Sequence, residues 1–350
     1  DWLVGINGTR ALTCKYNAQL SCGRVQTPTL AMIAKREEEI RKFVPKPYYG
    51  LQLQAEGVVF TWKDEKSGSY RSFQKDRIAN IQKQLSGKKL QIIKADTKVK
   101  KQGAPQLYDL TQLQREANQK FGFSAKETLN IMQRLYENHK VLTYPRTDSR
   151  YLTADVMGTI KERLQAINAG VYREFVAPLI RRELPKKPAF VNDAKVSDHH
   201  AIIPTEQAPN YIHMSNEERK IYDMVVRRFL AVMYPAYEYE ESVLTGAVEG
   251  EHFYARGTRP LHMGWKAIYE NQSEDEEEEE LKRQNLPIMQ KGQEFSISDI
   301  RLTEGKTKPP ARFTEGTLIA AMENPVRYME SGNKEMAKTL GETGGLGTVA

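Results

Sequence analysis

Two segments of this 350-residue chain alternate apolar and polar side chains with a period of two, and a long helical stretch separates them. Such alternation is typical of antiparallel strands that bury one face and leave the other in solvent. The two segments span residues 46–105 and 236–308. The simplest fold joins them in one β domain, into which residues 106–235 are inserted as a second domain.

The two ends of the chain have helical patterns as well. We expect them to meet as two parts of a helical base domain, which brings the chain ends close together. The sequence therefore predicts a multi-domain α and β fold with nested domains. Its parts are a helical base in residues 1–45 and 309–350, a β domain in residues 46–105 and 236–308, and an inserted domain in residues 106–235.

Capping residues mark where several helices begin, because their side chains can bind the free N–H groups of the first turn. The predicted caps are Ser124 with Glu127, Ser215 with Glu218, Thr27 ahead of Pro28, and Thr314. Helical spacing then predicts which side chains face the core. These are Leu30, Ile33, Ala34 and Ile40 after Pro28, and Leu129, Met132, Leu135 and Tyr136 after Ser124.

The charged residues favour a polyanionic partner. There are 52 Lys and Arg against 45 Asp and Glu, which gives a net charge of +7. Much of the acid is concentrated in one run, Glu274 to Glu280, which we interpret as a solvated loop without a catalytic role. The remainder is strongly basic and favours nucleic acid before membrane. The alternative is a basic surface that binds no polyanion.

The cysteines and the apolar residues indicate a compartment. Cys14 and Cys22 are the two cysteines, and their number predicts reduced thiols in a cytoplasmic protein. No apolar run approaches the length of a membrane span, and the first residues do not resemble a signal peptide. Because the sequence begins without Met and stops in a glycine-rich run at residues 344–350, we expect a fragment of a longer protein.

Residues 141–150 hold the strongest indication of chemistry. Tyr144 stands two residues before Arg146, and Pro145 stiffens the turn between them. A phenol is a poor nucleophile at neutral pH, but a guanidinium held close can stabilise a forming phenolate and an attacked phosphate. This pattern predicts phosphoryl transfer. The alternative is a buried ring followed by an ordinary polar loop.

A second polar segment, residues 21–27, lies at the expected start of a helix. It contains Gly23, Arg24, Gln26 and Thr27. Free backbone N–H groups at a helix N-terminus attract anions, so this segment could bind a phosphate. The alternative, which this segment on its own favours, is a plain capped turn.

His199 and His200 are adjacent on a segment that reads as extended. Neighbouring side chains of an extended segment point to opposite sides, so both rings cannot face one target. Asp198 is the one further ligand with usable spacing, which argues against a metal site here. We expect one histidine to face a phosphate and the other to be structural.

Four segments, in this order, resemble the motifs of the type IA DNA topoisomerases, specifically the bacterial topoisomerase III subclass. Together they cover essentially the whole chain. They are Leu20–Leu30, Leu142–Ser149, Ser197–Thr205, and Pro309–Thr314 with Gly345–Thr348.

The resemblance implies a toroidal core with a helical base, an antiparallel β hinge domain and an inserted helix-turn-helix-like domain. That domain carries the tyrosine and swings away to open a gate for DNA. The resemblance also implies cleavage and religation of one DNA strand through a 5′-phosphotyrosine intermediate, and hence relaxation or decatenation without ATP.

The motifs also imply roles for single residues. Tyr144 would be the nucleophile, Arg146 would stabilise the phosphate charge, and His199 would assist at the scissile phosphate. Single-stranded DNA would be held by stacking and by charge. The residues assigned to DNA binding are Trp2, Arg10, Ser21, Cys22, Gly23, Arg24, Val25, Gln26 and His200.

The sequence departs from the family in one respect. Family members begin with a Toprim domain whose acidic residues bind Mg²⁺, and this sequence has no such motif, so we expect the Mg²⁺ site on a missing domain. The chain is then a monomeric, nucleoid-associated bacterial protein that binds single-stranded DNA and does not cleave it alone. The alternative is a non-catalytic single-stranded nucleic-acid-binding module. A tyrosine recombinase is disfavoured because Tyr144 lies mid-chain.

Overall fold

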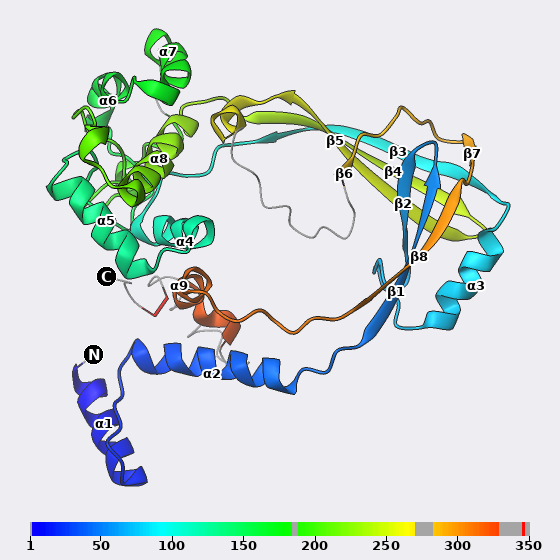
Figure 1. Ribbon diagram of the computed structural model, residues 1–350, viewed down its shortest axis with the longest axis horizontal. Coiled ribbons are helices and arrows are strands. Elements are labelled where there is room, and N and C mark those ends of the chain that lie inside the picture. The colour runs from blue at the N-terminus through cyan, green and yellow to red at the C-terminus, as the bar shows by residue number, and fades with distance from the viewer. Residues whose placement is uncertain (1, 184–187, 270–282, 329–344, 347–350) are drawn as a thin grey trace. The chain divides into compact units, whose positions relative to one another are not determined.

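The computed structural model describes residues 2–183, 188–269, 283–328 and 345–346 (Figure 1). Its contacts divide the chain into two compact units. The helical unit consists of Asp1–Phe43, Pro105–Met233 and Pro310–Ala350, and the β unit of Val44–Ala104 and Tyr234–Pro309. Helices together with an antiparallel sheet confirm the predicted fold class. The further division of the helical unit into a base and an inserted domain stays a prediction.

The β unit is built on one 8-stranded sheet with the order β7-β3-β4-β5-β2-β1-β8, in which β6 pairs with β5. Neighbours along this path are antiparallel, and the short β6 runs parallel to β5. β3 and β4 pair from Gln91↔Ala247 to Gln102↔Tyr237, so the sheet joins the segments before and after the insertion. The strands are β1 (Pro47–Ala55), β2 (Val58–Lys63), β3 (Lys89–Gln102), β4 (Tyr237–Val248), β5 (Glu251–His262), β6 (Arg283–Gln284), β7 (Glu294–Ser296) and β8 (Asp299–Lys306).

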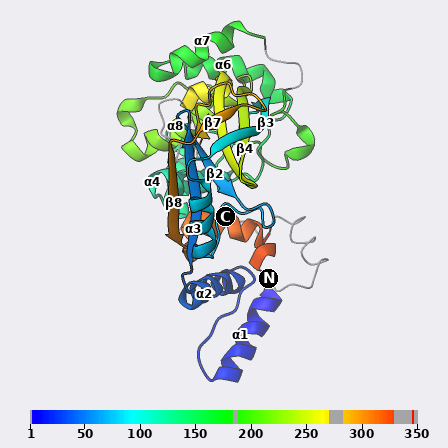
Figure 2. The same ribbon diagram turned by 90° about the vertical axis from the view of Figure 1, so that its right-hand side faces the viewer.

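The expectation of strands throughout residues 46–105 is wrong at α3 (Lys75–Leu85). The buried Ile78, Ile81 and Leu85 of this helix are spaced three and four residues apart, which is a helical period. α3 contacts β1 and β8 and lies along them in both views (Figures 1 and 2). The core beside it includes the fully buried Leu51, Phe60, Trp62, Leu90, Ile92 and Phe253.

The helical unit contains the remaining α-helices. α9 packs against α4, and both α4 and α8 contact α5 (Figure 1). Among the described residues, no helix has the length and apolar content that a membrane span needs. The helices are α1 (Trp2–Tyr16), α2 (Gln26–Lys42), α4 (Leu110–Phe121), α5 (Ala125–Glu137), α6 (Ile160–Ala166), α7 (Arg173–Arg181), α8 (Asn216–Ala231) and α9 (Glu315–Glu323). Short 3-10 helices of this unit span Asp155–Thr159, Gly170–Tyr172, Asp193–Lys195, Tyr211–His213 and Pro325–Tyr328, and the β unit has one at Gly264–Tyr269.

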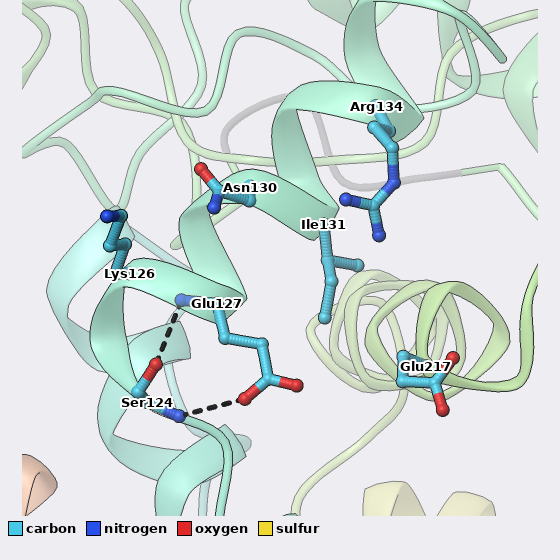
Figure 3. A pocket seen from close by; sticks show the side chains of 7 residues that line it. All are labelled: Ser124, Lys126, Glu127, Asn130, Ile131, Arg134 and Glu217. Atoms are coloured by element: carbon cyan, nitrogen blue, oxygen red, sulfur yellow. Dashed lines mark hydrogen bonds between the residues drawn. The ribbon is translucent and has the colours of Figure 1, made fainter.

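The predicted capping boxes of α5 and α8 are confirmed. The Ser124 hydroxyl accepts a hydrogen bond from the N–H of Glu127, whose carboxylate accepts one from the N–H of Ser124 (Figure 3). Ser215 and Glu218 form the same box at α8. Thr314 caps α9, as predicted.

The predicted start of α2 is wrong. The helix begins at Gln26, behind Val25. The Thr27 hydroxyl does not cap it but accepts a hydrogen bond from the N–H of Gly23 (3.0 Å). This bond closes the turn ahead of the helix, and the N–H of Thr27 donates back to the Gly23 carbonyl (3.2 Å). Thr27 is therefore part of the first turn and lies too far along the chain to cap it.

The predicted apolar stripe of α2 is also wrong. Met32 is buried, whereas Leu30 is 66% exposed. Polar and cation–π contacts hold the helix to the segment ahead of α9 instead. Arg36 donates to the Ala311 carbonyl (2.6 Å), and its guanidinium carbon lies 4.4 Å from the centroid of the Phe313 ring. The other predicted positions are half-buried at Ile33 and Ile40 and exposed at Ala34.

The buried face of α5 differs from the prediction at two positions. Leu129 is half-buried and Tyr136 is 37% exposed, so neither belongs to the core. The observed face is rotated from the predicted one toward Thr128 and Ile131, and α5 contacts both α4 and α8. That face consists of Thr128, Ile131, Met132 and Leu135.

Replacing Ser124 by Ala is expected to lower the free energy of unfolding of the helical unit by about 1 kcal/mol, because the Glu127 N–H loses its acceptor. Denaturant titration followed by far-UV circular dichroism measures this change. Lys126→Ala is the matched control, because Lys126 is exposed on the same turn (Figure 3). Equal losses in the two variants would argue against the capping role.

Candidate active site

Two segments run side by side in the helical unit, and we call them the tyrosine segment (residues 141–150) and the histidine segment (residues 195–205). Leu142 forms an antiparallel bridge with Pro204, and the N–H of Thr143 donates to the Ile203 carbonyl (3.0 Å). Both segments are anchored in the core by apolar side chains. The buried ones are Val141, Leu142, Ala201, Ile202 and Ile203.

This pairing brings the rings of Tyr144 and His199 together. Their centroids are 4.2 Å apart, with an interplanar angle of 37°. Tyr136, from the last turn of α5, meets the Tyr144 ring edge-on at 5.5 Å. Tyr144 is half-buried and His199 is exposed. No residue that the structure describes forms a hydrogen bond with the Tyr144 hydroxyl. The ring is thus fixed by packing, and its hydroxyl is available for chemistry.

The structure separates the two adjacent histidines. His200 is half-buried, and its Nδ1 lies 2.7 Å from the Ala201 carbonyl oxygen. Burial lowers the pKa of His200, although the hydrogen bond to Ala201 opposes this shift. His200 is therefore a half-buried ring bound to the main chain, whereas the exposed His199 lies against Tyr144.

The two arginines of the tyrosine segment have different surroundings. Arg146 is exposed and forms no hydrogen bond or ion pair with any residue in the described part of the chain. The Nε of Arg150 lies 2.5 Å from Oδ2 of Asp109, and Asp109 also caps α4. Arg150 thus ties the tyrosine segment to α4, while Arg146 is free to meet an anion.

Residues 21–26, which the sequence assigns to DNA binding, lie against α1. The N–H of Cys22 donates to the Thr9 hydroxyl (2.9 Å). Gly8 permits this close approach, because a Cβ at that position would lie 2.7 Å from the Cys22 Sγ. The segment is therefore shaped by its contact with α1.

Many polar groups of residues 21–26 are engaged within the chain. The N–H of Gly23 donates to a threonine hydroxyl of α2 (3.0 Å), and Arg24 donates to the Leu346 carbonyl (2.7 Å). The Gln26 amide reaches the Ser21 hydroxyl at 3.5 Å. In the described part of the chain, no hydrogen bond or ring contact joins these residues to the tyrosine or histidine segment. The other predicted DNA-binding residues are Trp2, which is 76% exposed, the exposed Arg10 and the half-buried Val25.

Sequence reasoning missed two neighbours of Tyr144 and His199. Tyr136 was assigned to the core, yet its ring meets Tyr144. Thr147 is 7% exposed, and its hydroxyl donates to the His199 carbonyl (2.8 Å). The tyrosine could have been recognised at the margin of the buried face of α5. The threonine gave no signal, because its partner is 52 residues away in the sequence.

A pocket of about 450 Å³ lies beside α5 and α8 and includes no residue of the tyrosine or histidine segment (Figure 3). Its charges are mixed, and Glu218 binds the Arg134 guanidinium (2.6 Å). The pocket therefore favours neither anions nor cations. Its lining residues are Ser124, Lys126, Glu127, Asn130, Ile131, Arg134 and Glu217.

Within the residues that the structure describes, no group of three or more His, Cys, Asp or Glu side chains could hold a metal ion. The acidic run Glu274 to Glu280 lies outside the described residues. The described side chains therefore do not fit a magnesium site.

Comparisons with known proteins agree with one another. A family model described as DNA topoisomerase matches residues 1–350. The chain is 53% identical to DNA topoisomerase 3 of Bacillus subtilis (strain 168) over 350 residues, which are 100% of this chain and 48% of that protein. It is 54% identical to DNA topoisomerase 3 of Bacillus cereus (strain ATCC 14579) over 352 residues, with the same shares. The chain thus spans about half the length of the curated relatives it matches.

The fold is also similar to a solved structure. The full-length topoisomerase I from Thermotoga maritima, in a monoclinic crystal form, matches with a TM-score of 0.69 and 25% sequence identity. The match covers 92% of this chain and 51% of that one. The family match over the whole chain, the identity to these relatives and the shared fold place this chain in the type IA DNA topoisomerase family, with similarity to its bacterial topoisomerase III members.

Proposed function

We propose that this chain supplies the tyrosine part of an active site that cleaves and rejoins one strand of DNA. The observation that carries the proposal is the 4.2 Å contact between the rings of Tyr144 and His199. The Tyr144 hydroxyl has no hydrogen-bond partner among the described residues, so it can act as a nucleophile. The exposed His199 imidazole beside it can exchange a proton.

In the proposed reaction, the phenolic oxygen of Tyr144 attacks the phosphorus of a phosphodiester, and the bond from phosphorus to the 3′ oxygen breaks. The phenol loses its proton and the leaving 3′ oxygen gains one. The products are a 5′-phosphotyrosine and a free 3′ hydroxyl. Because one phosphoester bond replaces another, the reverse reaction reseals the strand without ATP.

The surroundings of each side chain support its proposed role. Arg146, exposed and without an ion pair among the described residues, neutralises charge on the attacked phosphate. His199 contacts the phosphate or relays the proton beside Tyr144. His200 supports the main chain of the histidine segment, and it is the second candidate for contact with DNA.

Single-stranded DNA would approach along the exposed cations and aromatic rings of the helical unit. Trp2 is available for stacking on a base and Arg10 for pairing with a phosphate. The internal bonds of residues 21–26 hold that segment in one shape ahead of binding, so little ordering entropy opposes the contact.

Family membership implies dependence on Mg²⁺, but the described side chains do not fit its site. We propose that the ion is held by the part of the relatives that this chain does not match. We propose that the whole protein is a monomer of the bacterial cytoplasm that is associated with the nucleoid. Its proposed activity is the relaxation or decatenation of DNA.

The second candidate function is binding of single-stranded DNA without cleavage. It is favoured by the net charge of +7 together with the lack of metal-binding carboxylate groups among the described residues. The two candidates differ in whether Tyr144 becomes linked to DNA.

A covalent trapping assay tests the proposal. A single-stranded oligonucleotide labelled at its 3′ end is incubated with Mg²⁺ and a hybrid, in which this chain replaces the matching half of the Bacillus subtilis protein. After quenching with denaturant, label on the protein is expected. Binding of the oligonucleotide without any adduct would favour the second candidate.

Binding of single-stranded DNA is expected to weaken steeply with salt, because each neutralised phosphate releases counterions. The logarithm of the affinity should fall with the logarithm of salt concentration by about 0.7 for each phosphate contact. Fluorescence anisotropy of a labelled oligonucleotide measures the slope. Arg10→Ala is expected to reduce it by about 0.7, whereas Arg259→Ala, which removes an exposed cation paired with Glu240 in the β unit, should not. A flat salt response would argue against phosphate contacts.

A further inference from the structure

We propose that Thr147 is a positioning residue that sets the placement of His199 against Tyr144. The inference rests on the proposed function, because it concerns the same site. Its starting point is a pattern of hydroxyl groups: three side chains of the tyrosine segment each donate to a carbonyl of the histidine segment. The pairs are Thr143 with Ala201 (3.2 Å), Thr147 with His199 (2.8 Å) and Ser149 with Lys195 (2.8 Å).

Thr147 differs from the other two because its bond reaches the main chain of His199 itself. Among the described residues, no bond between main-chain groups involves residues 197–200. The Thr147 hydroxyl makes the one hydrogen bond to the His199 main chain that occurs in that part of the protein. Where the backbone lacks a partner of its own, a side-chain hydroxyl decides its position.

Thr147 is itself held firmly. It is 7% exposed, its hydroxyl accepts a hydrogen bond from the N–H of Ser149 (3.1 Å), and its carbonyl accepts one from the N–H of Leu110 (3.0 Å). Leu110 is the first residue of α4. The buried Thr147 hydroxyl thus connects the main chain of His199 to the start of α4.

The consequence concerns rate more than binding. Thr147→Val keeps the shape of the side chain but removes its donor and acceptor, so the His199 carbonyl is released. A displacement of about 1 Å at a reacting group costs up to about 100-fold in rate. Because Thr147 is buried, it does not contact DNA directly, and the affinity for single strands should not change.

The chain contains a closely matched control. The half-buried Thr205 donates its hydroxyl to the carbonyl of Lys140 (2.6 Å), the residue just before the tyrosine segment, and accepts from the N–H two residues further on, that of Gln207 (3.2 Å). Thr205→Val therefore removes one donated and one accepted hydrogen bond, as Thr147→Val does, but neither bond involves His199. Thr147→Ser keeps the hydroxyl and should therefore preserve the position of His199.

The first experiment uses this chain alone and measures how close the His199 ring lies to the Tyr144 ring. With histidine labelled for NMR, the His199 ring signals carry a shift from the Tyr144 ring current, and Tyr144→Ala gives the position without it. Thr147→Val is expected to move the His199 signals toward that position, and Thr147→Ser and Thr205→Val to leave them in place. Unchanged His199 signals in Thr147→Val would overturn the inference.

The second experiment measures covalent adduct formation and oligonucleotide affinity in the hybrid with the Bacillus subtilis protein. Thr147→Val is expected to slow adduct formation by about 10- to 100-fold with unchanged affinity. Thr147→Ser and Thr205→Val should stay close to the parent hybrid. Equal slowing in Thr147→Val and Thr205→Val would mean that Thr147 contributes only to packing, and this would overturn the inference. A parent hybrid without any adduct would instead overturn the proposed function, and the NMR result would still decide the role of Thr147.

Discussion

Replacing Tyr144 by Phe is expected to abolish the covalent DNA adduct completely while leaving the affinity for single-stranded DNA unchanged. The variant keeps the ring that packs against His199 and Tyr136. It loses the oxygen that would attack phosphorus, and a phenyl ring cannot form a phosphoester. Label transfer in the trapping assay and fluorescence anisotropy in parallel measure the two quantities.

Tyr151→Phe is the control for this variant. Tyr151 follows the same segment, is half-buried, and its hydroxyl accepts a hydrogen bond from the Gln106 amide (2.6 Å). Loss of that hydroxyl should leave adduct formation intact. An adduct that persists in Tyr144→Phe would mean that another side chain is the nucleophile, and the assignment of Tyr144 would be abandoned.

Replacing Arg228 by Met is expected to lower the free energy of unfolding of the helical unit by about 3–5 kcal/mol, because it leaves a largely buried carboxylate without its cation. Arg228 is 6% exposed. Its guanidinium donates to Glu116 (2.7 Å), to the Tyr108 hydroxyl (2.9 Å) and to the Gln106 carbonyl (2.9 Å), so it links α8 to α4 and to the start of the insertion.

The same pair predicts how stability depends on pH. Burial on its own raises the pKa of the Glu116 carboxyl, but the Arg228 cation and the hydrogen bond from Tyr108 outweigh it and hold that pKa below its ordinary value. A carboxyl with a depressed folded pKa contributes stability above its unfolded pKa, and this contribution is lost as the pH falls through the folded pKa. The double variant Glu116→Gln with Arg228→Met should therefore recover part of the lost stability. Its free energy of unfolding should also fall less steeply as the pH is lowered.

Denaturant titration at several pH values measures both effects. Arg312→Met is the control, because Arg312 forms a similar two-point ion pair with Glu37 but is 73% exposed. Exposed pairs contribute about 0–1 kcal/mol. If Arg228→Met were no more destabilising than Arg312→Met, the buried pair would not be a principal link between α4 and α8.

The sheet was predictable from the sequence because its signal is local and repeated. Alternation in residues 46–105 and 236–308 predicted strands on both sides of the insertion, and Ser124 and Ser215 marked helix starts by their own spacing to a glutamate. α3 was missed because a short amphipathic helix lay inside a segment dominated by strands. The stripe of α2 failed because periodicity shows which residues share a face but not whether anything covers it.

The candidate site was less accessible to prediction. The residue types at Tyr144, Arg146 and His199 carried the chemistry, but their roles stay predictions. The sequence could not show which histidine faces Tyr144, because this depends on how the tyrosine segment packs against the histidine segment after folding. Thr147 acts on a residue distant in the sequence, and such a contact exists only after folding.

The strand pairing also determines the order in which the chain can fold during synthesis. β3 pairs with β4 and β7, and both are made after the insertion, so this 14-residue strand must wait for its partners while the ribosome completes residues 105–233. An unpaired strand invites association with other chains, and lysine is the residue that proteins use most to prevent it. The waiting strand is accordingly rich in that residue, at Lys89, Lys94, Lys98, Lys100 and Lys101.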